Sequence, residues 1–207
     1  MKKTEVYFDK PIYVGQAILD LSKTLTFDFH YNYILRKYPA GASGEAQVLF
    51  ADTDSLMYQI QSDDFYEDIS EDIEDKFATS DYPTDHKSGI LTGVNKKVIG
   101  MFKDEVAGQQ ITHFVGLRPK LYSFKIENNR EDVRKCKGIR KNVVKKSLSF
   151  QQYVQCLFSG EKQMKSMKII RSENHDIYSK EIKKVALSAD DNKRIVMDDK
   201  INTLAIR

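Results

Sequence analysis

The chain has 207 residues, 30% of them charged, and a formal net charge of only +3. That length can bury a real core, in one domain or in one large and one small unit. The nearly balanced charge excludes a uniformly basic or acidic protein, so any attraction to a polyanion has to come from local clusters.

Cysteine usage and hydropathy limit the compartment. Cys136 and Cys156 form no C-x-x-C pair, which argues against a disulfide scaffold or a zinc ribbon and favours a reducing compartment. The four histidines lack metal-ligand spacing, so we interpret them as surface or packing residues. No apolar run reaches membrane-spanning length, and residues 1–8 contain no signal-peptide core. We therefore expect a soluble intracellular protein or fragment that does not enter a membrane.

The first predicted element is a long helix over residues 13–38. Its apolar residues recur three and four positions apart, which places them on one helical face. Pro11 before the start and Pro39 after the end suit these boundaries. The face consists of Val14, Ile18, Leu21, Leu25, Phe29 and Tyr33.

A hairpin with two aspartates at its tip follows. Residues 47–50 and 56–60 are strand-like apolar runs, and Asp52 and Asp54 lie between them in an Asp-Thr-Asp-Ser sequence. Carboxylates this close repel each other, so either one is protonated or a divalent cation lies beside them. Mg²⁺ fits, because it is usually held by one or two carboxylates together with water and substrate phosphates. The alternative is a purely structural turn, since Asp, Thr and Ser are common turn residues.

An acidic helix is predicted over residues 63–77, with a loop over 78–95 after it. Phe65, Ile69, Ile73 and Phe77 form one apolar stripe of the helix. We interpret the remaining acidic residues as a solvated face rather than a second metal site. They are Asp64, Glu67, Asp68, Glu71, Asp72 and Asp75.

Three strands are predicted next, over residues 98–102, 114–117 and 121–126. We place Lys120, just before the last of these ranges, and Tyr122 on one strand. Residues two apart in a strand point to the same face, so they would offer a phosphate-binding cation beside an aromatic ring. The alternative is a surface strand with an incidental lysine and a half-buried tyrosine.

The charge changes sharply at this point, and a basic surface segment begins. Such a segment supplies sequence-independent affinity for nucleic-acid phosphates. Its members are Arg118, Lys120, Lys125, Arg130, Arg134, Lys135, Lys137, Arg140, Lys141, Lys145 and Lys146.

The C-terminal third is predicted to contain one helix and short strands. The helix covers residues 150–158, with Ser149 as N-cap and Gly160 past its end. Short β-like runs follow at 168–170 and 194–197, and residues 198–200 turn a last hairpin.

In this order the features resemble family B DNA polymerases. The Asp52–Ser55 sequence is similar to motif C, the palm hairpin that carries catalytic carboxylates, and the preceding helix stands where that family has a long palm helix. Lys120-Leu121-Tyr122 is similar to the K-x-Y motif, which contacts the primer strand. Residues 135–139, with the lysines and phenylalanine that follow, resemble the palm-to-thumb junction of protein-primed members. Residues 10–15, 96–102 and 186–191 resemble the polymerases of Maverick or Polinton transposons and their viral relatives.

The resemblance implies an α+β fold and a set of site residues. Residues 1–138 would be the C-terminal portion of a palm, a long helix plus an antiparallel sheet with the Asp-Thr-Asp hairpin, and 139–207 a small thumb. Asp54 would ligate Mg²⁺ directly, with Asp52 as an auxiliary ligand; the complete enzyme uses two ions. Lys120 and Tyr122 would steady the primer end. The residues expected at duplex phosphates are Lys137, Arg140 and Lys141.

The resemblance also implies the reaction and the partners. The reaction would be template-directed transfer of deoxynucleotides in DNA replication, with a primer–template, deoxynucleoside triphosphates and a possible terminal-protein primer. We expect the nucleus or a viral replication site. Ala51 stands where many members carry glycine. The chain contains no counterpart of the motif A aspartate or the motif B helix, so we expect it to be inactive alone.

Two other classes remain open from the sequence. One is a non-catalytic nucleic-acid-binding module, in which the basic segment matters and the hairpin is structural. The other is a glycosyltransferase-like enzyme that holds Mn²⁺ on a sugar nucleotide through Asp52 and Asp54. That class needs an upstream nucleotide-binding α/β unit, and the N-terminal part offers one helix.

Overall fold

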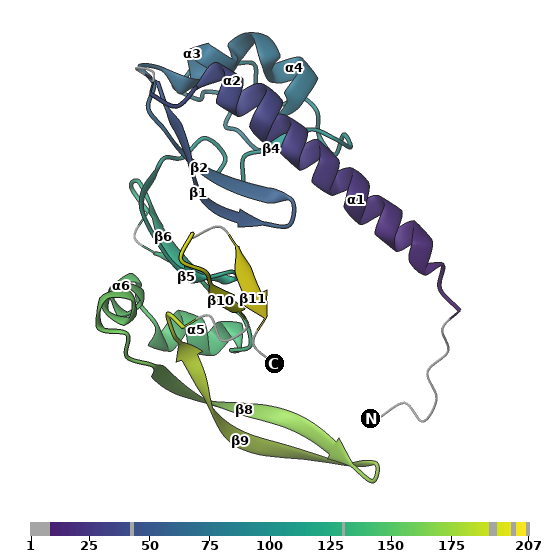
Figure 1. The fold of residues 1–207 in the computed structure, drawn as a ribbon, viewed down its shortest axis with the longest axis vertical. Helices are drawn as coiled ribbons and strands as arrows, with labels where there is room; N and C mark the ends of the chain where they lie inside the picture. Colours follow the sequence, from purple (N-terminus) through teal and green to yellow (C-terminus); the bar gives the residue numbers. More distant parts are fainter. Residues whose placement is uncertain (1–8, 42–43, 130, 191–193, 200–201, 206–207) are drawn as a thin grey trace. The chain divides into compact units, whose positions relative to one another are not determined.

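A computed structural model describes residues 9–41, 44–129, 131–190, 194–199 and 202–205, and the fold is α+β, as predicted (Figure 1). The chain divides into two compact units after Gln110. We call residues 9–110 the N-terminal unit and the described residues from 111 onward the C-terminal unit. The division at residue 138, which depends on the resemblance, stays a prediction about family domains.

The N-terminal unit begins with the predicted long helix. α1 (Ile12–Asp28) continues without interruption through a π-helical stretch (Phe29–Ile34) into α2 (Leu35–Lys37). Proline at the N-cap position costs no helical hydrogen bond, so Pro11 marks the start. The C-terminal half packs into a small core in which Ile34, Tyr38 and Ala46 are buried. Phe29 adds a stacked contact with Phe102, with ring centroids 3.8 Å apart.

The predicted carboxylate hairpin is confirmed. β1 (Ala46–Asp52) and β2 (Ser55–Ile60) pair antiparallel, and a bulge lies between Val48 and Phe50. Bulges increase the local twist of a hairpin. The register ends with Asp52 opposite Ser55, so the connecting turn has two residues.

The predicted acidic helix forms as three consecutive short helices. They are α3 (Phe65–Ile69), a 3₁₀ turn (Ser70–Asp72) and α4 (Ile73–Lys76). The Asp64 side chain caps α3 by accepting from two backbone N–H groups. Ile69 and Ile73 are buried, as the predicted apolar stripe requires, but Phe77, its last member, lies after the helices in strand β3 (Phe77–Ala78).

The interpretation of the acidic face as merely solvated is wrong for two residues. Asp68 accepts hydrogen bonds from the hydroxyls of Tyr38, at 2.7 Å, and Ser62, at 2.5 Å. Asp72 accepts from the Tyr33 hydroxyl, at 2.7 Å, and from Lys37. These bonds attach the acidic helices to the long helix.

The predicted strand over residues 98–102 is mostly a turn. Lys97 and Gly100 have positive φ, at 59° and 90°, which an extended strand excludes. Only β4 (Phe102–Lys103) is extended, and it pairs in parallel with β3 (Phe77–Ala78). The predicted loop between the two strands is confirmed, with Lys103 paired to Asp81.

The C-terminal unit is built on a three-stranded antiparallel sheet. β5 (Ile111–Arg118), β6 (Leu121–Ile126) and β7 (Val133–Cys136) lie in this order. The first two strands were predicted. Strand β7 and the short helix α5 (Lys141–Ser147) were not predicted, because the basic segment lacks a clear apolar pattern.

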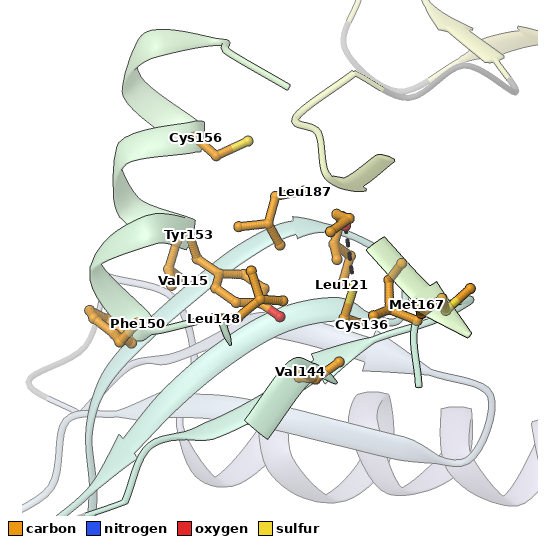
Figure 2. Packing of buried hydrophobic residues seen from close by; sticks show 12 residues of the cluster. Val115, Leu121, Cys136, Val144, Leu148, Phe150, Tyr153, Cys156, Met167 and Leu187 are labelled. Carbon is orange, nitrogen blue, oxygen red and sulfur yellow. Dashed lines mark hydrogen bonds between the residues drawn. The ribbon is translucent and has the colours of Figure 1, made fainter. Parts of the chain in front are cut away.

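Helix α6 (Phe150–Ser159) has the N-cap and C-cap residues that were predicted. Ser149 and Gln152 form a capping box, and Gly160 adopts the left-handed conformation at the C-cap. The helix contributes Tyr153 and Cys156 to the main core, both fully buried (Figure 2). The Tyr153 hydroxyl donates to the Lys135 carbonyl on β7, which ties α6 to the sheet.

A long hairpin replaces the short β-like run predicted at residues 168–170. β8 (Gln163–Glu173) pairs with β9 (Asp176–Leu187) through a tight turn in which Asn174 and His175 both have positive φ. Met167 and Leu187 lie in the core beside Leu121 and Cys136 (Figure 2). The Cys136 thiol donates to the Ala186 carbonyl at 3.2 Å, and burial raises its pKa to about 11.

The predicted last hairpin is also present. β10 (Arg194–Val196) pairs with β11 (Thr203–Ala205). Asp199 lies in its connection, and Lys200, the last residue of the predicted turn, lies outside the described residues. Residues 186–191 were predicted to resemble a segment of transposon polymerases. The last of them, Asp191, also lies outside the described residues.

Candidate metal and nucleic-acid sites

Asp52 and Asp54 lie at the apex of the β1–β2 hairpin, as predicted. Asp52 is the last residue of β1 and is half-buried, whereas Asp54 lies in the turn and is exposed. The Thr53 hydroxyl donates to Oδ1 of Asp52 at 3.1 Å. We call Asp52, Thr53 and Asp54 the carboxylate tip.

The turn holds Thr53 in a costly conformation. Its φ is +63°, in the left-handed region that β-branched residues avoid. A two-residue hairpin turn needs positive φ at its first central residue, and glycine or asparagine usually supplies it. Strain of this kind is often found at functional turns, where the surrounding structure maintains it.

The donor set of the carboxylate tip suits a hard cation. Two carboxylates are what Mg²⁺ usually takes from a protein, and water or phosphate oxygens complete the octahedron. Among the described residues no group of three or more His, Cys, Asp or Glu side chains is arranged to hold a metal ion. The tip by itself therefore supplies a cation with two carboxylate ligands, and water or phosphate oxygens would supply the others.

The hairpin that carries the tip is anchored to the long helix. Tyr58 on β2 shares a hydrogen bond of 2.9 Å with Nδ1 of His30, which lies in the π-helical stretch. Burial raises the pKa of Tyr58 to about 12, so its hydroxyl stays protonated at neutral pH. π-helical stretches are frequent at functional sites because they redirect side chains. His30 is thus a packing residue, as predicted, and it orients β2.

The prediction that Lys120 and Tyr122 share a strand face is wrong. Lys120 lies with Pro119 in the turn between β5 and β6, and its φ is +62°. The side-chain alternation of a strand therefore does not apply to it. Tyr122 is half-buried on β6, with its ring near Phe114 and Phe124 at centroid distances of 6.1 and 6.3 Å.

Lys120 instead lies beside a second basic turn. The backbone N–H of Lys137 donates to the Lys120 carbonyl at 3.1 Å, which brings the turn after β7 next to the turn after β5. Lys137, Arg140 and Lys141 are all exposed in or just after this second turn. Four of the predicted DNA-binding residues therefore come from two adjoining turns and the start of α5.

The β8–β9 hairpin extends this basic area with cations that were not predicted as site residues. Nζ of Lys184 lies 3.5 Å from the Gly138 carbonyl, within the second turn. Lys165 is directly opposite Lys184 in the hairpin register. Like charges directly opposite each other destabilise a strand pair, and a bound anion would relieve that repulsion.

The same face of the hairpin carries further cations toward its tip. Lys180 pairs with Ile169, and Arg171 pairs with Tyr178, in register with Lys165 and Lys184. On β8 this face carries Lys165 and Arg171 but also the apolar residues Met167 and Ile169, so no local charge pattern in the sequence marks it. We define the cationic surface as Lys120, Lys137, Arg140, Lys141, Lys165 and Lys184.

No helix in the described part of the chain combines the length and apolarity that crossing a membrane requires. Comparison of the chain with protein-family models, with curated proteins and with solved structures gives no match.

Proposed function

We propose that this chain is part of a DNA-directed DNA polymerase of family B and that it is inactive by itself. The observation that carries the proposal is the carboxylate tip, an Asp-Thr-Asp sequence at the apex of a two-residue hairpin turn. The protein-primed subgroup, a terminal-protein primer and a replication-site location belong to the same proposal.

The residues of the tip have distinct roles in this proposal. Asp54, exposed in the turn, is the direct ligand of Mg²⁺, and half-buried Asp52 is the auxiliary ligand. Bound Mg²⁺ supplies positive charge that offsets the charge building on the phosphoryl oxygens. The strained turn at Thr53 holds the two carboxylates together, and the Tyr58–His30 bond fixes the strand behind them.

The cationic surface binds the phosphates of the primer–template in this proposal. Lys120 and Lys137 come from adjoining turns, and Lys184 extends the area onto the long hairpin. Tyr122 contributes an aromatic ring beside the first turn. Contacts of this kind position the duplex without reading its sequence.

An experiment in two arms tests the polymerase proposal. The chain alone is predicted to give no primer extension, because it lacks counterparts of motifs A and B. A longer version that supplies both motifs is predicted to extend a primer, and Asp54→Asn in it abolishes extension while DNA affinity persists. Asp63→Asn, an exposed aspartate after β2, is the matched control and leaves extension unchanged. Extension by the chain alone, or by the Asp54→Asn version, contradicts the proposal.

A non-catalytic nucleic-acid-binding module is the second candidate, and the extent of the cationic surface favours it. Both candidates predict DNA binding that weakens steeply with salt, because phosphate contacts release counterions. Lys184→Glu should weaken binding at least several-fold, whereas Lys168→Glu, on the opposite face of the hairpin, should change it little. The module alone predicts that Asp54→Asn has no effect on any activity of the longer version.

A further inference from the structure

We propose that the exposed apolar face of α1 pairs in antiparallel orientation with α1 of a second copy of the chain. The face consists of Val14, Ile18, Leu21 and Leu25, which are 44%, 60%, 71% and 42% exposed. We call these four residues the α1 stripe. Figure 1 shows the first turns of α1 extending beyond the other elements of the N-terminal unit. This inference does not depend on the polymerase proposal.

The spacing of the α1 stripe is that of a helix–helix seam. Successive members are four, three and four residues apart, which is the a/d spacing of a coiled coil. The positions beside the seam carry small residues, which allow another helix to approach closely. They are Gly15, Ala17, Ser22 and Thr24.

Gly15 gives a separate indication of close approach. Glycine inside a helix costs about 1 kcal/mol relative to alanine. A Cβ at Gly15 would meet nothing within 4 Å in the chain itself, so no internal contact explains the glycine. A partner backbone beside the seam would explain it.

The exposed stripe continues a face that is buried further along the same helix. Phe29, the next apolar residue on that face, is packed against Phe102. Leu25 lies at the boundary, where its Cδ2 would be 3.9 Å from a Cβ added to Gly100. The neighbouring Ile99 is 99% exposed. The apolar surface therefore runs from the helix onto this turn, and an apolar surface of that extent is typical of an interface.

Charge at the two ends of the stripe favours a second copy in antiparallel orientation. Antiparallel pairing places Ile18 against the partner's Leu21, and Val14 against the partner's Leu25. It also brings Lys10, before the helix, toward the partner's Asp28, twice in a two-fold pair. Asp28 is exposed and accepts one hydrogen bond, from Asn32 at 2.6 Å. A parallel pair would instead place like charges together.

The size of α1 sets the expected strength. Its 17 residues span about 25 Å at ~1.5 Å per residue. One helix on each side buries less than the roughly 800 Å² per partner of a standard interface. We therefore expect a dimer that dissociates in the micromolar range.

Sedimentation of the whole chain over a wide concentration range tests the pairing. The expected result is a monomer–dimer equilibrium that Leu21→Glu weakens at least tenfold. Leu19→Glu is the matched control, because Leu19 is 60% exposed on the same helix but lies off the stripe. It should change the dimer constant less than twofold. A monomer at every concentration, or equal effects of the two variants, overturns the proposal.

Cysteine crosslinking tests the orientation. A Val14→Cys chain mixed with a Leu25→Cys chain should form mainly the mixed disulfide dimer. Preferential formation of the 14–14 dimer contradicts antiparallel pairing. Circular dichroism of each variant checks folding, and Ile18→Gln, a milder change on the stripe, replaces Leu21→Glu if that variant unfolds. Ile18→Gln should also weaken the dimer, and an unchanged dimer constant counts against the proposal.

Discussion

The N-terminal unit contains two groups of aspartates with opposite surroundings. Asp68 and Asp72 on the acidic helices accept hydrogen bonds from tyrosine, serine and lysine donors. Asp52 and Asp54 lie at a hairpin apex, where the turn backbone is strained. The same residue type thus holds helices together in one place, whereas Asp54 at the hairpin apex is exposed. Hydrogen bonds from the long helix, rather than the local density of acidic residues, distinguish Asp68 and Asp72 from Asp54.

The largest expected effect comes from removing a carboxylate of the first group. Asp68→Ala leaves the hydroxyl of buried Tyr38 without its acceptor, and we expect a loss of about 2 kcal/mol in the free energy of unfolding. Asp54→Ala should change it by less than about 0.5 kcal/mol, because Asp54 is exposed in a turn. Urea unfolding of both variants measures the difference. Equal losses would remove the distinction between the two groups.

The pH dependence of stability should also distinguish the two groups of aspartates. Hydrogen bonds from Ser62 and Tyr38 lower the pKa of Asp68. Burial alone would raise the pKa of Asp72, but Lys37 and Tyr33 outweigh it and lower that pKa too. A carboxyl whose folded pKa is lowered contributes stability above its unfolded pKa of about 4, and this contribution is lost as pH falls through the folded pKa.

The melting temperature should therefore fall between about pH 5 and pH 3, and this fall should be smaller in Asp68→Asn. Asp54→Asn serves as the control and should melt with the pH profile of the unmodified chain. Thermal melts at intervals of half a pH unit measure both. An unchanged profile in Asp68→Asn would mean that its hydrogen bonds do not contribute to acid stability.

A smaller effect is expected behind the carboxylate tip. Tyr58→Phe removes the hydrogen bond to His30 and should cost about 1 kcal/mol. Tyr31→Phe, on the same helical stretch as His30 but with an exposed ring, is the control and should be neutral. A neutral Tyr58→Phe would show that this bond does not hold the hairpin.

The smallest predicted change is a gain in stability. Thr53→Gly removes a β-branched side chain from positive φ, which outweighs the added freedom of the unfolded chain by about 0.5 kcal/mol. Ser55→Gly, in the adjoining strand, should instead destabilise the hairpin. Loss of stability in Thr53→Gly would mean that the turn is not strained.

Local signals predicted several parts of this molecule well. The 4-3-4 apolar spacing predicted the long helix, Ser149 and Gly160 predicted the ends of α6, and two apolar runs around Asp52 and Asp54 predicted the hairpin. In each case the determinant lies within a few residues of the element it specifies.

Predictions failed where the structure is determined by a local backbone conformation or by contacts between residues far apart in the sequence. Residues 98–102 are apolar, but positive φ at Lys97 and Gly100 turns the chain there. Lys120 adopts positive φ in a turn that alternation alone does not reveal. Tyr38 and Tyr33, which donate to Asp68 and Asp72, lie 30 and 39 residues before them. Lys165 faces Lys184 through a hairpin register. Periodicity within a short window contains none of these contacts.

The most direct test of the carboxylate tip as a metal site is to locate where a divalent cation binds to the chain. Mn²⁺ is titrated into the isotopically labelled chain, and the broadening of backbone NMR signals is followed residue by residue. We expect broadening centred on Asp52–Ser55 and its loss in Asp54→Asn, with signals around Asp68 and Asp72 little affected. Broadening centred on Asp68 and Asp72, or none at the hairpin apex, would contradict the role of the carboxylate tip as a metal site.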